Sequence, residues 1–567
     1  MKKTNNRNYN VFFNTHTVTG IIISVGLYIC FFAGAFSLFM HNIDNWEANC
    51  KSEAYKPSID YERVLSIAEN EGYNLDGRTI FIRYRDGHTP YVQVNARPPK
   101  TKKDSTENTN SILTKRDSLA KASIFLKLDA DTYKITAREN SPETGSLGGF
   151  LYQLHYFGQI PNFGLYLSAL VSLFFLFAIV TGTIVHWKKI VSNFFTFRLK
   201  GGIKNLWTDA HTALGIIGLP FQFMYAVTGA LFGVVMLIFI PTVMLLYDGD
   251  QEKMTGSLIP GRKAFEMVNE PLAKRENINE LVDKTFQYFG KGDLTNMIVT
   301  VSAYNDKNAH LTVNLNKKNI KGLFNDAYAS YRLSDGEMIV SKGVSDNSYK
   351  TGVLIGLTNL HFANFGGYFI KAIYFILALI TCFVILSGVM VWLEARNSKK
   401  YESKKKFNTN VGAVYLGASL GLFPAIALFF CITKIFPLEM EGRFSTMSTV
   451  FFLFWLAYIV YSFFIKDFHR TNKHALILAG VMGVTIPLLN GIQSGLWPWK
   501  SLSQGYIDSF FVDIIWFFLG MVSIYVGLKV KRLVSHKRKN NGKESTAEKV
   551  QDAAIATIGH KLLENEQ

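Results

Sequence analysis

Eight long apolar stretches constrain the fold of this chain more than any other feature of its sequence. Hydrophobic residues make up 49% of the 567 residues, and they are bunched into runs instead of being spread evenly. In an α-helix, about twenty apolar residues span the hydrocarbon core of a bilayer. The sequence therefore predicts a polytopic α-helical membrane protein with about eight transmembrane helices, near residues 18–39, 161–187, 212–246, 367–393, 411–436, 447–465, 475–493 and 509–530.

Basic residues gather at alternate ends of these predicted helices. The formal net charge is +17, yet the short loops 437–446 and 494–508 hold one basic residue each. Cytoplasmic loops carry an excess of Lys and Arg, so we expect the basic clusters and both termini in the cytoplasm and segments 41–150 and 247–360 outside. The positive charge then marks topology in a lipid bilayer, and no nucleic-acid partner is expected. The clusters lie at 2–7, 188–204, 396–406, 466–473 and 529–539.

Two of the predicted helices begin with nearly the same line of sequence. His16 opens HTVTGIIISVGLYICFFAGAF, and His211, 195 positions later, opens HTALGIIGLPFQFMYAVTGAL. A Leu-His pair likewise precedes an apolar run at His155 and at His361, and a glycine follows 27 residues after each of these histidines. The first four helices therefore form an internal twofold repeat. The gapless match also indicates that the first stretch is a retained helix and not a cleaved signal peptide.

Both outer segments combine helical and strand patterns. The first has helical periodicity at 58–72 and alternates like strands at 79–85, 91–97 and 124–139. The second predicts helices near 261–272 and 278–289 and strands at 296–304, 310–316 and 326–338. We expect each segment to fold as a small α+β module.

The order of histidine-led helix, outer domain, Leu-His pair and second helix occurs twice between about residues 10 and 395. This arrangement resembles the PepSY-associated transmembrane family, which includes iron-regulated inner-membrane proteins and ferrisiderophore reductases with two b-type haems. The resemblance implies two PepSY-like periplasmic domains, a place in the bacterial cytoplasmic (inner) membrane, and ferric iron or a ferric siderophore as partner. The last four helices lie outside the family pattern.

The expected organisation follows from the apolar stretches and the repeat. Its units are an N-terminal segment with the first helix (1–40), the first PepSY-like domain (41–153), helices two and three with their cytoplasmic loop (154–246), the second PepSY-like domain (247–359), helix four (360–395), a C-terminal four-helix membrane unit (409–530) and a basic cytoplasmic tail (531–567).

Four histidines in two register-matched pairs indicate cofactor binding. On the predicted topology, His16 and His211 begin helices at the cytoplasmic face, and His155 and His361 precede helices at the outer face. Each pair takes one member from each half, as expected for halves that face each other across a pseudo-twofold axis normal to the membrane. Neutral imidazole is a common axial ligand of haem iron. We therefore expect two haems, one in each histidine pair, and the family resemblance implies that both are of the b type.

Glycines recur on the same helix face as the first pair of histidines. Gly20 and Gly215 lie four residues after them, and Gly34 and Gly229 lie eighteen residues after them, which is five helical turns. A flat macrocycle needs a missing side chain where it lies against a helix, so these glycines are predicted to pack against the two haems. Close helix–helix packing through small residues is the alternative.

His186 is the alternative ligand at the cytoplasmic-side haem, in place of His16 or His211. It ends the second predicted helix at that face, but its counterpart in the second half is Trp392, so it breaks the symmetry of the repeat.

The soluble parts contain no G-x-G-x-x-G after a strand and no G-x-x-x-x-G-K-[ST]. A separate cytoplasmic donor, or a quinol in the membrane, is therefore expected to supply electrons. The resulting hypothesis is a transmembrane haem-dependent ferric or ferrisiderophore reductase for iron acquisition. One rival hypothesis is a non-redox transporter or permease, whose weakness is the expected lack of buried acidic or basic residues within the predicted spans. The other is a PepSY-type membrane-anchored regulator or sensor, which would leave the paired histidines unexplained.

Overall fold

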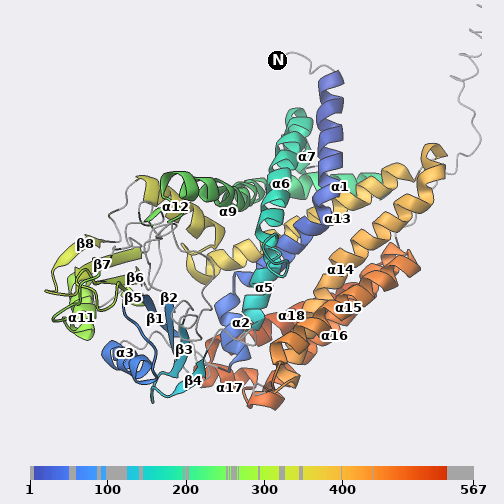
Figure 1. Ribbon diagram of the computed structural model, residues 1–567. Helices are drawn as coiled ribbons and strands as arrows, with labels where there is room; N and C mark the ends of the chain where they lie inside the picture. The colour runs from blue at the N-terminus through green and yellow to red at the C-terminus, as the bar shows by residue number, and fades with distance from the viewer. Residues whose placement is uncertain are drawn as a thin grey trace, which may run out of the picture.

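The computed structural model describes residues 6–49, 59–85, 91–97, 124–138, 145–195, 198, 203–250, 253–254, 256, 265, 267–290, 294–317, 326–343, 346, 349–397, 399–437 and 440–532. Within these residues, eight helices are long and apolar enough to cross a membrane, which confirms a polytopic helical membrane protein (Figure 1). They are α1 (Asn6–Ser37), α6 (Gly164–His186), α9 (Leu219–Leu246), α13 (Gly367–Arg396), α14 (Lys405–Ile435), α15 (Arg443–Ile465), α16 (Phe468–Ser494) and α18 (Ile507–Lys529).

Short helices flank the spans of the two repeats. In the first half, α2 (Met40–Glu47) follows α1, and α5 (Leu147–His155) precedes α6; the short η2 (Trp187–Lys189) and α7 (Ile190–Phe195) follow it. In the second half, α8 (Ile203–Ile217) precedes α9, and α12 (Tyr349–His361) precedes α13. The predicted span 212–246 is interrupted at Gly218, because Pro220, near the start of α9, lacks the N–H that would continue the α8 ladder.

The prediction that His16 and His211 begin their helices is wrong. The helix α1 starts ten residues before His16, and α8 starts eight residues before His211. Neither preceding stretch contains Gly or Pro, so nothing in the local sequence ends the helix at the histidine. The Leu-His pairs do lie at helix ends, since His155 and His361 are the last residues of α5 and α12.

The two outer modules share one eight-stranded antiparallel sheet. The strands are β1 (Thr79–Arg85), β2 (Tyr91–Arg97), β3 (Ile124–Asp129), β4 (Ile135–Arg138), β5 (Leu294–Ser302), β6 (His310–Lys317), β7 (Asp326–Arg332) and β8 (Met338–Lys342), in the order β4-β3-β2-β1-β5-β6-β7-β8. Strands β1 and β5 join the modules, with Phe81 opposite Thr300 and Ile82 opposite Val299. Apolar side chains of one sheet face pack with α3 (Tyr61–Asn70) and α11 (Ile278–Phe289) in a single core.

The helix predicted near 261–272 is not present where the structure describes this segment. Residues 267–272 are non-helical, and Pro271 forms an isolated bridge with Asp306. Proline disfavours the α conformation of the residue before it, and Glu270 instead accepts a backbone hydrogen bond from Lys307. Residues 257–264 and the basic tail from 533 onward lie outside the described residues.

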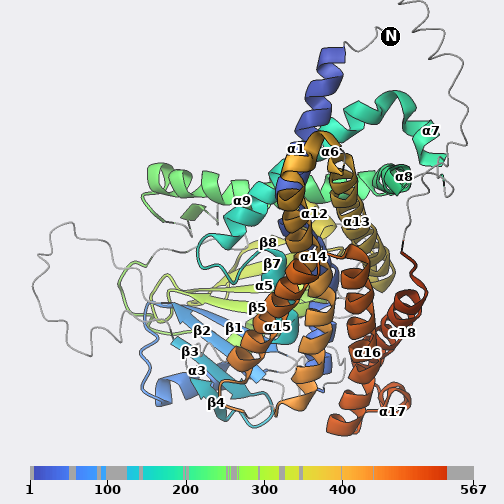
Figure 2. The same ribbon diagram turned by 90° about the vertical axis from the view of Figure 1, so that its right-hand side faces the viewer.

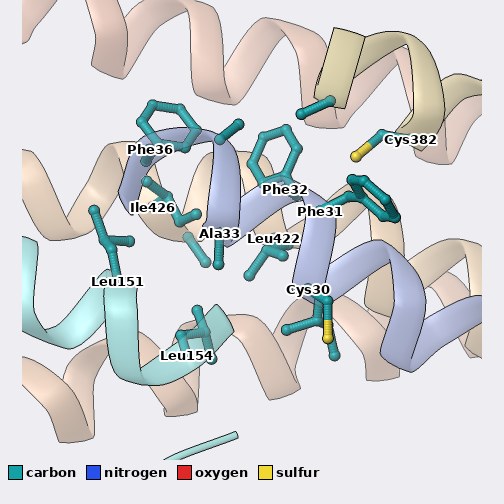
Figure 3. Close-up of a cluster of buried hydrophobic side chains, with 14 of the residues drawn as sticks. Cys30, Phe31, Phe32, Ala33, Phe36, Leu151, Leu154, Cys382, Leu422 and Ile426 are labelled. Carbon is teal, nitrogen blue, oxygen red and sulfur yellow. The ribbon is translucent and has the colours of Figure 1, made fainter. Parts of the chain in front are cut away.

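The C-terminal helices pack against the repeat mainly through α14 and α18. Figure 3 shows Phe32, Ala33 and Phe36 of α1 beside Leu422 and Ile426 of α14, with Leu151 of α5 completing the cluster. Ala33, Leu422 and Ile426 are fully buried. Helices α14, α15, α16 and α18 stand together as a bundle (Figure 2), and the short α17 (Pro498–Ser503) caps the α16–α18 connection.

The shared sheet can be tested with an engineered disulfide. In a Cys50→Ser background, Phe81→Cys with Thr300→Cys should form an intramolecular disulfide on mild oxidation, because opposed residues of antiparallel strands have Cα atoms about 4.5–5.5 Å apart. The control pair is Phe81→Cys with Thr312→Cys, which is one strand further away, at roughly 10 Å. Mass spectrometry of the oxidised protein should find the first cross-link only; equal yields would contradict the β1–β5 pairing.

Candidate functional site

The structure brings four distant histidines together in two pairs. His16 and His211 form the pair that lies away from the shared sheet, here called the distal pair. Their ring centroids are 6.1 Å apart, and their ring planes meet at 64°. His155 and His361 form the sheet-side pair, with centroids 5.9 Å apart and planes at 54°. Each pair takes one histidine from each half of the repeat.

Each histidine of the distal pair lies against a glycine of a facing helix. The Nδ1 atom of His16 is 2.8 Å from the carbonyl oxygen of Ala178 on α6. A Cβ atom on Gly182, one turn later, would lie 2.9 Å from the His16 ring. The second half repeats this contact, because Nδ1 of His211 is 2.9 Å from the carbonyl oxygen of Val384 on α13.

A Cβ atom on Gly388, one turn after Val384, would lie 3.1 Å from the His211 ring. The Ser387 hydroxyl lies 3.2 Å from the same Nδ1 atom. In both halves, therefore, the imidazole fills the space that a side chain on the glycine would take, and its Nδ1 bonds the carbonyl four residues earlier.

The sheet-side pair uses one contact of the same kind and one different contact. Nδ1 of His155 is 2.6 Å from the carbonyl oxygen of Cys30 on α1, and a Cβ atom on Gly34, one turn later, would lie 2.6 Å from that nitrogen. His361 instead has Nδ1 2.8 Å from the hydroxyl of Thr228 on α9. The Tyr225 hydroxyl also donates a 2.8 Å hydrogen bond to the His361 carbonyl.

These partners determine which ring nitrogen carries the proton. Carbonyl oxygens only accept hydrogen bonds, so Nδ1 of His16, His155 and His211 must donate. The Thr228 hydroxyl donates to the carbonyl of Met224 and therefore accepts from Nδ1 of His361. All four imidazoles are thus oriented as Nδ1–H tautomers whose Nε2 lone pair is available to a metal, as in metal-binding histidines with a second hydrogen-bond partner.

The spacing within each pair suits one metal ion between two imidazoles. Metal–imidazole nitrogen distances of about 2.0–2.1 Å on both sides place the two ring centroids roughly 6 Å apart. The observed separations are 6.1 and 5.9 Å. Among the described residues, no group of three or more His, Cys, Asp and Glu side chains forms a metal site, so each pair offers two protein ligands.

A cavity of about 450 Å³ surrounds the sheet-side pair. Its lining includes both histidines, the two distant glycines of the repeat and several aromatic rings; these residues are His155, His361, Gly34, Gly229, Phe31, Phe175, Phe221, Tyr225 and Phe232. The volume falls within the range of pockets that bind small molecules and cofactors, about 300–1,000 Å³. The sheet-side pair therefore lies in a mostly apolar cavity that is partly open to the outside.

Residues 13–395 match the profile of the PepSY-associated TM region. The chain belongs to this family. The matched stretch contains all four paired histidines and ends before α14, so the C-terminal bundle lies outside it. No curated protein matches the chain.

The four glycines predicted to pack against a cofactor have different surroundings in this PepSY-associated protein. Gly34 contacts His155, and Gly229 lines the cavity while also allowing α9 to approach Ser172 of α6. A Cβ atom on Gly20 would meet no atom within 4 Å, and one on Gly215 would meet only Val384, at 3.9 Å. Gly20 and Gly215 thus leave open space beside the distal pair. Gly229 also allows the close helix–helix packing that was the alternative to a role in cofactor binding.

His186 lies close enough to His16 and His211 to interact with both electrostatically. It is the last residue of α6, one turn beyond the glycine that faces His16. The structure therefore places His186 beside the distal pair, while the ring-to-ring contact at 6.1 Å joins His16 with His211.

The sequence interpretation missed the supporting role of Gly182 and Gly388. Each glycine follows its Leu-His histidine, His155 or His361, by 27 residues, which marked both as matching positions of the repeat. The sequence alone does not show that Gly182 faces His16 and Gly388 faces His211. The Thr228 contact with His361 was also missed, because its counterpart in the first half is Ala33 and it leaves no repeated signal.

The hydrogen bond from His361 to Thr228 can be tested with matched threonines on one helix. Thr228→Val removes the acceptor of the buried Nδ1–H and should lower the free energy of unfolding by about 1–3 kcal/mol. Thr242→Val is the control, because the Thr242 hydroxyl bonds only the carbonyl four residues earlier. Unfolding by SDS titration of the detergent-solubilised protein measures both. Equal losses would contradict the role of Thr228.

Proposed function

We propose that this PepSY-associated protein is a di-haem b membrane reductase that delivers electrons to ferric iron, free or siderophore-bound, outside the cytoplasmic membrane. The observation that carries the proposal is the repeated geometry of the histidines. Two imidazole pairs lie at the spacing of bis-histidine ligation, and all four rings have Nδ1 bonded to an acceptor.

The residues present fit two haems. His16 and His211 would hold one, and His155 and His361 the other; Gly20 and Gly215 leave room beside the first, and the apolar cavity encloses the second pair. The buried indole N–H of Trp207, one turn before His211, has no hydrogen-bond partner among the described residues and would suit an anionic cofactor group. When bound by these histidines, each haem would supply one-electron transfer.

The chain's own residues connect the two sites through an apolar interior. His16 of the distal pair and Gly34, which lies against His155 of the sheet-side pair, are both on α1. They are eighteen residues apart, or about 27 Å along the helix axis. Between them, Phe31 contacts the rings of Phe175, Phe221 and Tyr225, with centroids 5.5–6.2 Å apart. These four rings also line the cavity at the sheet-side pair, so they form a packed aromatic wall of that cavity.

The direction of electron flow follows from the topology that the basic clusters support. By the positive-inside rule, the distal pair would lie at the cytoplasmic face with both termini inside, and the shared sheet would lie outside the cytoplasm. The family resemblance implies that this membrane is the bacterial inner membrane. A cytoplasmic donor or a membrane quinol would then reduce the distal site. Ferric iron is held by hard oxygen donors, and one electron converts it to Fe(II), which these donors bind far more weakly, so reduction releases the metal.

The proposal predicts a coloured protein with two separable haems. Protein purified from haem-replete cells should contain about two b-type haems per chain and show the bands of low-spin haem on reduction by dithionite. His16→Ala should remove the distal haem alone, and His361→Ala the sheet-side haem alone, as measured by pyridine haemochrome.

The control is His186→Ala, which should keep both haems because His186 lies outside the ring pair. If His186→Ala loses a haem while His16→Ala or His211→Ala keeps both haems, His186 would replace that histidine as a ligand at the distal site. A colourless wild-type protein would overturn the proposed function.

A further inference from the structure

We propose that Glu47 and Arg443 are positioning residues for His155, so that the C-terminal bundle sets the ligand geometry of the sheet-side haem. This inference rests on the proposed function. It assigns a role to helices that lie outside the family match, through contacts between α2, α5 and the start of α15.

The helix α5 is held at both ends by the continuous segment α1–α2. At its start, the backbone N–H of Leu147 donates to Glu47 Oε2 at 2.6 Å, and that of Gly148 donates to Asp44 Oδ1 at 2.8 Å. At its end, His155 lies against Gly34 and bonds the Cys30 carbonyl. A helix of nine residues fixed in this way transmits a shift of its first turn to its last residue.

The approach of α5 to α2 depends on a glycine. A Cβ atom on Gly148 would lie 2.4 Å from the carbonyl oxygen of Met40 and 2.5 Å from Asp44 Oδ1. Carboxylates at a helix N-terminus are favoured because they satisfy free N–H groups and the helix dipole. Burial, and after it the negative charge of the neighbouring Glu47, raises the pKa of Asp44 to about 7. Glu47 differs from Asp44 in having a cationic partner of its own.

Arg443 is that partner. Its Nη1 donates to Glu47 Oε1 at 2.7 Å, and both side chains are about nine-tenths buried. Its other nitrogens donate to the carbonyls of Thr433, at 2.7 Å, and Phe436, at 3.3 Å, at the end of α14. Glu47 therefore connects the C-terminal bundle directly to the first turn of α5, with one carboxylate oxygen for each.

Further buried bonds hold α2 to the bundle. Lys434 Nζ donates to the carbonyl of Trp46 at 2.6 Å, and the Trp46 indole N–H donates to Asp513 Oδ1 at 2.8 Å. Asn490 donates to the second oxygen of Asp513 at 2.8 Å. Because α2 is fixed to α14, α16 and α18, Glu47 has little freedom to follow α5 if α5 moves.

The second half of the repeat lacks this connection. The positions equivalent to Asp44 and Glu47 are Phe239 and Thr242, which lie inside the uninterrupted helix α9. His361 is held instead by Thr228 and Tyr225. Disturbing Glu47 or Arg443 should therefore affect His155 and spare the distal pair, where neither residue makes a contact.

The test measures haem loss from the full-length, two-haem protein to excess apomyoglobin. Two dissociation phases are expected, assigned with His16→Ala, which retains only the sheet-side haem. Arg443→Met should accelerate the sheet-side phase by up to about 10-fold and leave the distal phase unchanged. Losing a direct partner of a metal ligand costs about 10–100-fold, and Arg443 acts on His155 only through Glu47 and α5. Arg470→Met, an exposed arginine in the same bundle, is the matched control and should change neither phase.

Two further variants separate positioning from general loss of structure. Glu47→Gln keeps an acceptor for the Leu147 N–H but removes the charge, so it should accelerate the same phase less than Arg443→Met. The double variant should be no worse than Arg443→Met alone, because the two residues act through one contact. If Arg443→Met does not accumulate, Glu47→Gln is measured instead. Its electron paramagnetic resonance spectrum should then show a change in the sheet-side haem signal alone.

Equal acceleration of both phases, or no acceleration in either variant, would overturn the positioning role while leaving the proposed function intact. A wild-type protein without haem would overturn the proposed function and this inference with it.

Discussion

The contact of an imidazole with a glycine on a facing helix is the interaction on which the rest of the structure depends. Three of the four paired histidines lie where a glycine leaves space and bond the carbonyl oxygen four residues before that glycine. A carbonyl oxygen can accept more than one hydrogen bond, so it can orient the ring while it remains part of the helix. The contact fixes ring position and tautomer together, and it joins helices that are far apart in the sequence.

Helices of the repeat contact these rings directly, and the C-terminal bundle contacts the segment that carries α2. Within the repeat, α1 supports His155, α6 supports His16, and α13 supports His211, so each half of the molecule orients the ligands of both pairs. The bundle adds an asymmetric feature through Glu47 and Arg443, which have no counterpart in the second half. The two pairs therefore differ in how they are held: the sheet-side pair has a connection to the C-terminal bundle, and the distal pair has no equivalent one among the described residues.

Much of the fold was predictable because its signals are local. Apolar runs located the eight spans, and strict alternation located β1 and β2 at their observed bounds. The joined sheet was not predictable, since the pairing of β1 with β5 links strands about 220 residues apart and leaves no local pattern. The histidine pairs could be inferred from repeat symmetry, whereas Thr228 and the Glu47–Arg443 contact break that symmetry and depend on tertiary packing.

The most direct test of the account is the axial ligation of the iron in the purified protein. Near-infrared magnetic circular dichroism, combined with electron paramagnetic resonance, distinguishes bis-imidazole haem from haem with other axial ligands. The account predicts two low-spin ferric centres per chain, both with bis-histidine ligation, and the loss of one centre each from His211→Ala and His155→Ala. High-spin centres, a single centre, or a ligand other than histidine at either site would contradict it.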